Sequence, residues 1–252
     1  KKRNWEFQYG ADKAGFVQYL LTDQPEPPKY FAKMKELNKV NRPLLTEVPT
    51  IKELSASELK TAMDNGMKLI DTRNKVDFQN GFIPGSINIQ GNNSFATWMG
   101  WFLTYDEKFI LVANDNEIEE LTRKLMRIGL DNVAGYIDTL EGLGELAKAD
   151  VIGLEEFKSF VADNETQVVD LRGVAEYNSG HVAGADNVFI GTLPQNLEKI
   201  SKDKQVVIHC QGGDRAAIGY SLLVKHGFTN VKNYSAGMNE WANEGNAIVS
   251  EA

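Results

Sequence analysis

The sequence has a single cysteine, Cys210, among its 252 residues. One thiol cannot form an internal disulfide, which excludes the small disulfide-stapled secreted scaffolds and favours a reducing compartment. No apolar run approaches the roughly 20 residues of a membrane-spanning helix, and polar residues interrupt the amino-terminal stretch too early for a secretion signal. We therefore expect a cytoplasmic protein.

Positive charge is also in short supply. There are 27 Lys and Arg residues against 35 Asp and Glu residues, so the formal net charge is −8. This balance argues against nucleic acid and anionic membranes as partners. Hydrophobic residues make up 42% of the chain, which is enough to build a packed core and too many for a disordered chain.

A sequence repeat organises most of the chain. The segment 69–89 reappears 99 positions later, without a gap, as 168–188. Chance agreement at this density is improbable, so we infer two copies of one structural unit. The identical pairs are Asp71/Asp170, Arg73/Arg172, Gly81/Gly180, Gly85/Gly184 and Asn88/Asn187.

Each copy alternates short apolar runs with helical patterns. The apolar run 109–112 corresponds to 206–209, and each run precedes a stretch with apolar residues at three- and four-residue steps. These stretches end before Gly129 and Gly227, which is typical of a helix stop. Strands that alternate with helices predict an α/β fold, in which each unit is a mainly parallel sheet flanked by helices.

The repeat also predicts the domain boundaries. We place the first unit at 48–147 and the second at 148–252, which leaves 1–47 as a partly helical amino-terminal segment. This segment combines aromatic residues, a proline-rich joint at 24–28 and a basic amphipathic stretch at 29–42. A free tail of this composition would be unusual, so we expect the segment to pack on a further domain.

The loop that follows the run 206–209 carries the strongest chemical signal. Gly212 and Gly213 permit the positive φ angles and close backbone approach that an anion cradle needs. Loop amides and the positive end of the next helix then point at Cys210 and favour its thiolate, the nucleophilic form. Arg215 adds a cationic fork for an oxyanion. A buried strand cysteine without a function would not require these neighbours.

The motifs of the second unit resemble those of the rhodanese sulfurtransferases. They are Cys210-x-Gly-Gly-x-Arg215, Asp170-Leu-Arg172, Gly180-His-Val-Ala-Gly-Ala185 and Gly237-Met-Asn-Glu-Trp241. The resemblance implies that Cys210 accepts a sulfane sulfur, carries it as a persulfide and passes it to a nucleophile. The implied cradle consists of Gln211, Gly212, Gly213, Asp214 and Arg215. The implied donors are thiosulfate or a low-molecular-weight thiol persulfide, and the implied acceptors are sulfite, cyanide or a thiol.

Two other functions remain open at this point. Related cysteine loops act in phosphatases and arsenate reductases, but the resemblance implies that a six-residue loop, such as Cys210 to Arg215, suits sulfur and a longer one suits phosphate. A non-catalytic interaction scaffold is the other alternative. Within the loop, Asp214 weakens the attraction for a doubly charged anion, which favours a persulfide over thiosulfate as the donor.

Four further residues of the second unit are expected around the loop. Asp170 and Arg172 recur in the copy that has no cysteine, so we expect them to hold the framework together. His181 could orient a loop, line the site or make a structural hydrogen bond. Trp241 is expected to pack near the site.

The first unit lacks the chemistry of the second. Ala113 stands where the cysteine lies in the second unit, and Ile118 stands where the arginine lies. Asn114 and Glu117 have the spacing of a capping box, which would occupy the helix amides that could otherwise bind an anion. We expect an inactive rhodanese-like unit that is retained for packing or partner contact. The aromatic cluster 98–102 is expected to pack in its core, and a lid or an interdomain contact is the alternative.

The stretches 16–21 and 25–38 resemble the closing helices of a metallo-β-lactamase-fold persulfide dioxygenase. In such fusion proteins an iron-dependent dioxygenase precedes an inactive and then an active rhodanese unit, which implies a role in sulfide or persulfide detoxification. The His-x-His-x-Asp-His signature is absent, so we expect no cofactor in this chain and non-haem iron only in a missing dioxygenase domain. The expected partners are small-molecule sulfur donors and acceptors and that domain, packed on 1–47; a homo-oligomer is left open.

Overall fold

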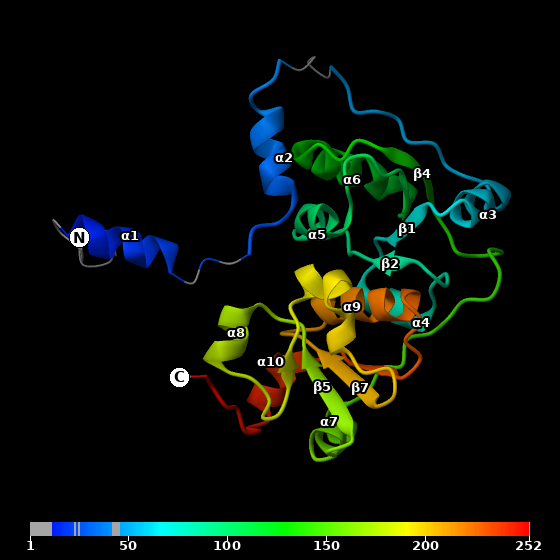
Figure 1. Ribbon diagram of the computed structural model, residues 1–252. Helices are drawn as coiled ribbons and strands as arrows, with labels where there is room; N and C mark the ends of the chain where they lie inside the picture. The colour runs from blue at the N-terminus through cyan, green and yellow to red at the C-terminus, as the bar shows by residue number, and fades with distance from the viewer. Residues whose placement is uncertain (1–11, 23, 25, 42–45, 252) are drawn as a thin grey trace.

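The computed structural model describes residues 12–22, 24, 26–41 and 46–251. Residues 1–11, 23, 25 and 42–45 of the predicted amino-terminal segment lie outside the described residues. Residues 46–251 form two α/β domains, which lie one above the other in Figure 1. Each domain contains a sheet of four parallel strands with helices packed around it, which confirms the predicted fold class.

The first domain has the strand order β2-β1-β3-β4. Its helices and strands are α3 (Ala56–Asp64), β1 (Lys68–Asp71), α4 (Lys75–Asn80), β2 (Ile87–Asn88), α5 (Phe95–Phe102), β3 (Phe109–Val112), α6 (Asp115–Ile128) and β4 (Val133–Ile137). Every residue of β3 is buried, as expected for an apolar central strand covered on both faces. Gly129 ends α6 in the left-handed conformation, with φ of 71°, which confirms the predicted helix stop.

The second domain repeats this order as β6-β5-β7-β8. Its elements are α7 (Leu154–Val161), β5 (Thr166–Asp170), α8 (Val174–Ser179), β6 (Asp186–Asn187), the 3-10 helices η2 (Ile190–Gln195) and η3 (Leu197–Lys199), β7 (Gln205–His209), α9 (Asp214–Lys225), β8 (Val231–Tyr234) and α10 (Gly237–Asn243). Between the second and third strands the first domain has α5 where the second has η2 and η3. The two domains therefore differ in the segment that contains the aromatic cluster 98–102.

The identical residues of the repeat form the same network in both domains. An arginine that follows the first strand donates to the aspartate at the strand's end and to a glycine carbonyl, while an asparagine of the second strand donates to two carbonyls of the same turn. The distances are Arg73 to Asp71 2.6 Å and to Gly81 2.8 Å, Arg172 to Asp170 and Gly180 2.7 Å each, and Asn88 and Asn187 to their two carbonyls 3.0 and 2.9 Å each. Buried polar groups need such partners, so the network explains why these residues recur without the cysteine.

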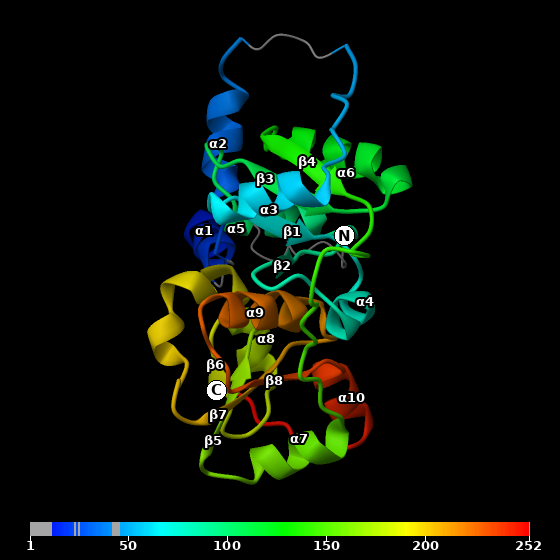
Figure 2. The ribbon, with the colours of Figure 1, turned by 90° about the vertical axis from the view of Figure 1, so that its right-hand side faces the viewer.

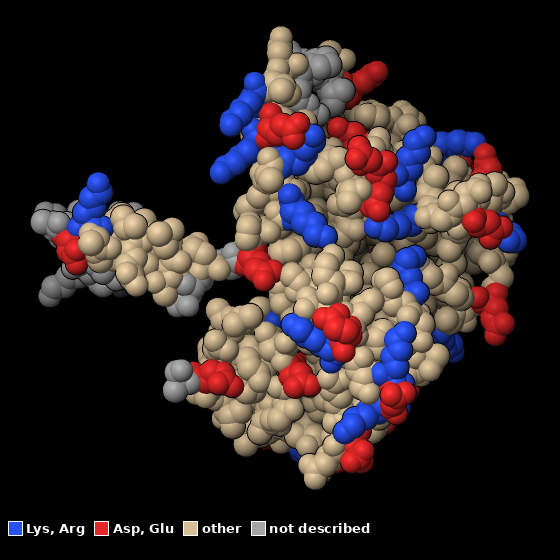
Figure 3. All heavy atoms as spheres, viewed as in Figure 1, with Lys and Arg blue, Asp and Glu red and all other residues tan. Residues whose placement is uncertain are grey.

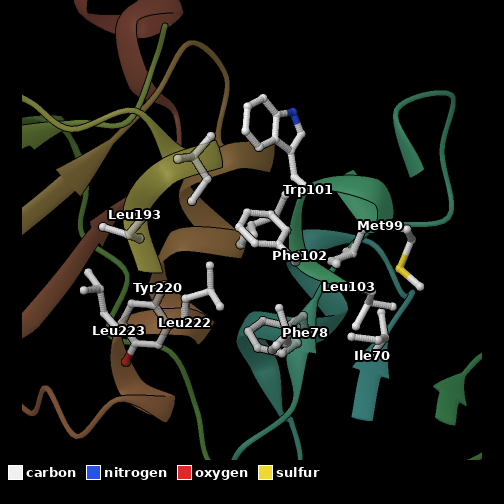
Figure 4. Packing of buried hydrophobic residues seen from close by; sticks show 14 of the residues in the cluster. Ile70, Phe78, Met99, Trp101, Phe102, Leu103, Leu193, Tyr220, Leu222 and Leu223 are labelled. Atoms are coloured by element: carbon white, nitrogen blue, oxygen red, sulfur yellow. The ribbon is translucent and has the colours of Figure 1, made fainter. Parts of the chain in front are cut away.

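One hydrophobic cluster, the shared core, spans both domains, and each domain also has a smaller core cluster of its own. Buried residues of both belong to a single cluster, and Figure 4 shows α5 and β1 side chains on one side of it and η2 and α9 side chains on the other. The Trp101 ring meets the Phe189 ring edge-on at 5.4 Å between centroids. A polar contact also joins the two domains, because the Asn88 backbone N–H donates to Ser221 Oγ at 3.0 Å. Helix α9 lies between the two sheets in Figures 1 and 2.

The amino-terminal helices differ in their contacts. Helix α2 (Tyr30–Leu37) packs Tyr30 and Met34 against the shared core. Helix α1 (Lys13–Leu21) has no buried residue and extends away from both domains, with a largely uncharged surface in Figure 3. Leu21 is 72% exposed. No helix within the described ranges is long and apolar enough to cross a membrane.

Candidate active site

Cys210 is placed by the end of β7 and the start of α9. Its side chain is buried, and the Gly213 backbone amide donates to its sulfur at 3.1 Å. The backbone around it is fixed from α10, because the Met238 amide donates to the Cys210 carbonyl and the Asn239 amide to the Gln211 carbonyl, both at 2.9 Å. The sulfur thus faces a backbone N–H donor in a loop that is hydrogen-bonded on its outer side.

Two glycines allow this loop to lie close to its neighbours. Gly213 has φ of 97°, and a Cβ built there would lie 2.2 Å from the Ser235 carbonyl oxygen. Gly237 has φ of 64°, and its Cβ would lie 2.3 Å from the Cys210 carbonyl oxygen. A side chain at either position would therefore be strained and would also push the loop away from the turn that supports it.

Arg215 is held in a bidentate ion pair rather than standing free. Its guanidinium donates to the two carboxylate oxygens of Glu176, on α8, at 2.5 and 2.8 Å. This hydrogen bond lowers the pKa of Glu176. Burial opposes the charge of Arg215, but the bond to Glu176 and the nearby Cys210 together raise the pKa of the guanidinium. The predicted cationic fork is present, and one carboxylate already neutralises it.

Asp214 is paired across the domain boundary. Lys75, on α4 of the first domain, lies 3.1 Å from its carboxylate and also donates to the Gly212 carbonyl oxygen. Asn92 of the first domain donates to the other carboxylate oxygen at 3.2 Å. The first domain therefore compensates the negative charge that the sequence placed in the cradle and holds the loop from a second side.

Gln211 connects the loop to the duplicated network. Its side-chain oxygen accepts from Arg172 Nη1 at 3.1 Å, and its nitrogen donates to the Asn239 side chain at 2.6 Å. Arg172 is 4% exposed and is already bonded to Asp170. The framework arginine therefore reaches the cysteine loop with its remaining nitrogen, which Arg73 cannot do in the first domain, because no cysteine loop lies there.

A cavity of about 440 Å³ opens at Cys210. From the second domain it is lined by Cys210, Gln211, Gly212, Asp214, Arg215, Ile218 and Asn239, and from the first domain by Gln90, Asn92, Ser94 and Trp98. Five of the residues predicted from the sequence are thus brought together. The first-domain residues were not predicted as part of the site.

His181 and Trp241 do not line this cavity. The His181 ring stacks on Tyr177 at 3.7 Å between centroids, and its Nδ1 lies 2.9 Å from the Tyr177 carbonyl oxygen. Trp241 packs edge-on against Phe157 and donates its indole N–H to the Ala247 carbonyl at 2.9 Å. Both side chains therefore make contacts within the second domain and outside the cavity.

Comparison with known proteins identifies the family of the chain. The model of the rhodanese-like domain matches residues 55–142 and 153–244, which together make up more than half of the chain. The chain belongs to the rhodanese-like domain family. This agrees with the two sheets of four parallel strands.

Several proteins are similar to this rhodanese-family chain. A sulfurtransferase of Allochromatium vinosum is 32% identical over 100 residues, which cover 39% of this chain and 94% of that protein. A tRNA uridine(34) hydroxylase of Pectobacterium atrosepticum is 30% identical over 178 residues, which cover 66% of this chain and 49% of that protein. The crystal structure of a metallo-beta-lactamase from Staphylococcus aureus is 31% identical over 54% of this chain and 38% of that chain, with a TM-score of 0.47.

The corresponding loop of the first rhodanese-like domain has a different helix start from the one predicted. The capping box is wrong: the Asn114 side chain donates to Glu117 at 3.0 Å and does not accept from a helix amide. Instead Asp138, after β4, accepts from the Asp115 amide at 2.8 Å. A carboxylate is the stronger partner for the positive helix end, and β4 delivers it there. Ala113 follows β3 just as Cys210 follows β7.

The aromatic cluster 98–102 divides between two roles. Met99 and Trp101 are buried in the shared core, as predicted. Trp98 is only partly buried and faces the cavity at Cys210. The repeat contains one signal that could have indicated the domain junction. Lys75 is polar, whereas the corresponding residue of the second unit, Val174, is apolar.

A metal site is not found in the part of the chain that the structure describes. No group of three or more His, Cys, Asp or Glu side chains there could hold an ion. The iron implied by the dioxygenase resemblance therefore has no fitting ligands on these residues.

Proposed function

We propose that this chain is a sulfurtransferase that carries sulfane sulfur as a persulfide on Cys210. The observation that supports this most is the buried thiol with the Gly213 amide 3.1 Å from its sulfur, at the wall of an open cavity. A backbone donor in this position stabilises negative charge on sulfur without adding a side chain that could react.

The proposed reaction has two displacements. The Cys210 thiolate attacks the outer sulfur of a donor R–S–SH, the S–S bond of the donor breaks, and R–S⁻ leaves and takes a proton. Cys210 then carries the outer sulfur as a persulfide. An acceptor such as sulfite, cyanide or a thiolate attacks this sulfur, and the Cys210 thiolate leaves, so no external oxidant or reductant is consumed.

The charges around the cavity favour a thiol persulfide over thiosulfate as the donor. Arg215 is neutralised by Glu176, and the negative charge of Asp214 is compensated by Lys75. A thiosulfate dianion would place both of its charges next to Cys210 and find no uncompensated cation among these residues, whereas the reacting persulfide group carries at most one charge. We place the reaction in cytoplasmic sulfide or persulfide detoxification.

We further propose that the parent protein carries a metallo-β-lactamase-fold dioxygenase domain next to α1 and α2, and that any iron is held there. The first rhodanese-like domain would then serve as a structural and substrate-binding partner without a nucleophile, since Ala113 takes the place of the cysteine. The interaction-scaffold alternative applies in this proposal to the first domain alone.

The test is sulfur loading followed by intact mass spectrometry. The protein is incubated with glutathione persulfide or thiosulfate, and one added sulfur atom is expected in the wild type and none in Cys210→Ser. Retention of the added sulfur in the serine variant would place the site elsewhere. A wild type that accepts no sulfur from either donor would contradict the proposal and favour a scaffold, and turnover of a phosphate ester would favour the phosphatase alternative.

A further inference from the structure

The cavity at Cys210 is much larger than its proposed cargo. One sulfur atom needs no more space than a water molecule, whose share of liquid volume is about 30 Å³. The cavity measures about 440 Å³, within the range of roughly 300 to 1,000 Å³ that small-molecule sites occupy. The remaining space can take the part of a donor that does not react.

One wall of this cavity comes from the first domain. Gln90, Asn92, Ser94 and Trp98 lie on the segment that leaves β2 and enters α5. Three hydrogen bonds hold this segment in place. The Asn92 side-chain nitrogen donates to Asp214, and the Asn92 side-chain oxygen accepts from the Ser94 backbone amide at 2.8 Å. Lys124 on α6 donates to the Gly91 carbonyl oxygen at 2.8 Å. The wall is therefore tied to the cysteine loop and to its own domain.

Three groups on the cavity wall have hydrogen-bonding capacity to spare. Among the described residues, no hydrogen-bond partner is found for the Gln90 side-chain amide, for the Trp98 indole N–H or for the Asn239 side-chain nitrogen. These groups are neutral and include both donors and an acceptor. The charged side chains of the cavity, by contrast, are already paired.

We propose that Gln90, Trp98 and Asn239 form a subsite for the thiol part of the donor, and that this part is an amide-bearing, peptide-like chain. This inference rests on the proposed sulfur transfer at Cys210. Neutral amides match a carbonamide chain, which offers N–H and C=O groups in turn, and the indole face covers its methylene groups. Thiosulfate lacks such a chain and would use the Cys210 loop alone.

The test compares two donors of different size in the variant Gln90→Leu, which keeps the approximate volume and removes the amide. KM for glutathione persulfide is expected to rise about 3- to 10-fold, the loss of one or two uncharged hydrogen bonds. KM for thiosulfate is expected to stay within twofold, which also shows that the cysteine loop is intact. Asn93→Ala, on the same segment but outside the cavity, should change neither value.

Two results would overturn the subsite. An unchanged KM for glutathione persulfide in Gln90→Leu is one, and an equal rise for both donors is the other, because it would reveal a general disturbance of the loop. Gln90→Glu places a negative charge on the same wall. It should raise KM for glutathione persulfide, an anionic tripeptide, more than Gln90→Leu does. If the wild type accepts sulfur but these variants behave like it, the subsite fails and the proposed function stands; if the wild type accepts none, the proposed function itself fails.

Discussion

Glu176 determines how much positive charge the cavity presents to a donor. Its carboxylate binds both terminal nitrogens of Arg215 and also accepts from the Gly173 amide. We expect Glu176→Gln to keep one hydrogen bond to the guanidinium and to remove its neutralising charge. kcat/KM for thiosulfate should then rise several-fold relative to kcat/KM for a thiol persulfide, because the dianion gains most from an unpaired cation.

Steady-state kinetics at two salt concentrations check this prediction. The gain for thiosulfate should shrink at high salt, because salt screens the attraction between the dianion and the unpaired Arg215 guanidinium. Glu155→Gln, which removes a similar ion pair to Lys158 on the outside of α7, serves as the control. A fall in kcat/KM for both donors in Glu176→Gln would instead mean that the carboxylate only positions Arg215.

Helix α4 connects the domain without a cysteine to the loop with one. Lys75, at its start, bonds the Gly212 carbonyl oxygen and the Asp214 carboxylate. We expect Lys75→Met to lower the rate of sulfur loading several-fold, because Asp214 is left uncompensated next to the incoming anion. Backbone amides of the loop should also exchange with deuterium faster, since one of its carbonyls loses its partner.

Stopped-flow loading and hydrogen exchange measure the two effects. Lys60→Met on α3 is the matched control, because Lys60 is exposed and pairs only with Asp64 on its own helix. A Lys75→Met protein with wild-type loading and wild-type exchange at 210–214 would show that α4 is merely a neighbour of the loop.

Elements were more predictable than the contacts between them. The periodicity predicted β3, β7 and α6 because each buries its own apolar face within one domain. It could not predict that Gln90 would line the cavity at Cys210 or that Lys75 would bind Asp214, because both depend on how two separately patterned units pack. The capping box failed for a related reason: Asp138, distant in sequence, competes for the same helix end.

Because the largest core cluster spans both domains, we expect the protein to unfold in one transition. Its stability should depend on pH through His209. This side chain is fully buried beside Phe157, and burial lowers its pKa below the ordinary value of 6.5. The unfolded chain binds a proton near pH 6.5 that the folded chain does not. The contribution of His209 to the free energy of unfolding is therefore fully present above pH 6.5 and is lost as the pH falls below 6.5.

Chemical denaturation between pH 7.5 and 5.5 measures this loss. His209 should account for up to about 1.4 kcal/mol of the decrease in unfolding free energy at pH 5.5. His209→Leu should flatten the dependence, whereas His226→Gln, at the exposed end of α9, should leave most of it. Equal slopes in the wild type and in His209→Leu would show that His209 titrates normally in the folded protein.

The wall that the first domain contributes to the cavity also decides how the protein can be divided for engineering. A fragment cut at the junction near residue 148 would keep the nucleophile and its arginine, but it would lose Lys75, Asn92 and Trp98 and would turn the inner face of α9 outward. A designer who wants a transplantable sulfur-delivery module should therefore take both domains as one part. The first domain, which has no cysteine, would be lost in such a fragment. It supplies one wall of the cavity at Cys210.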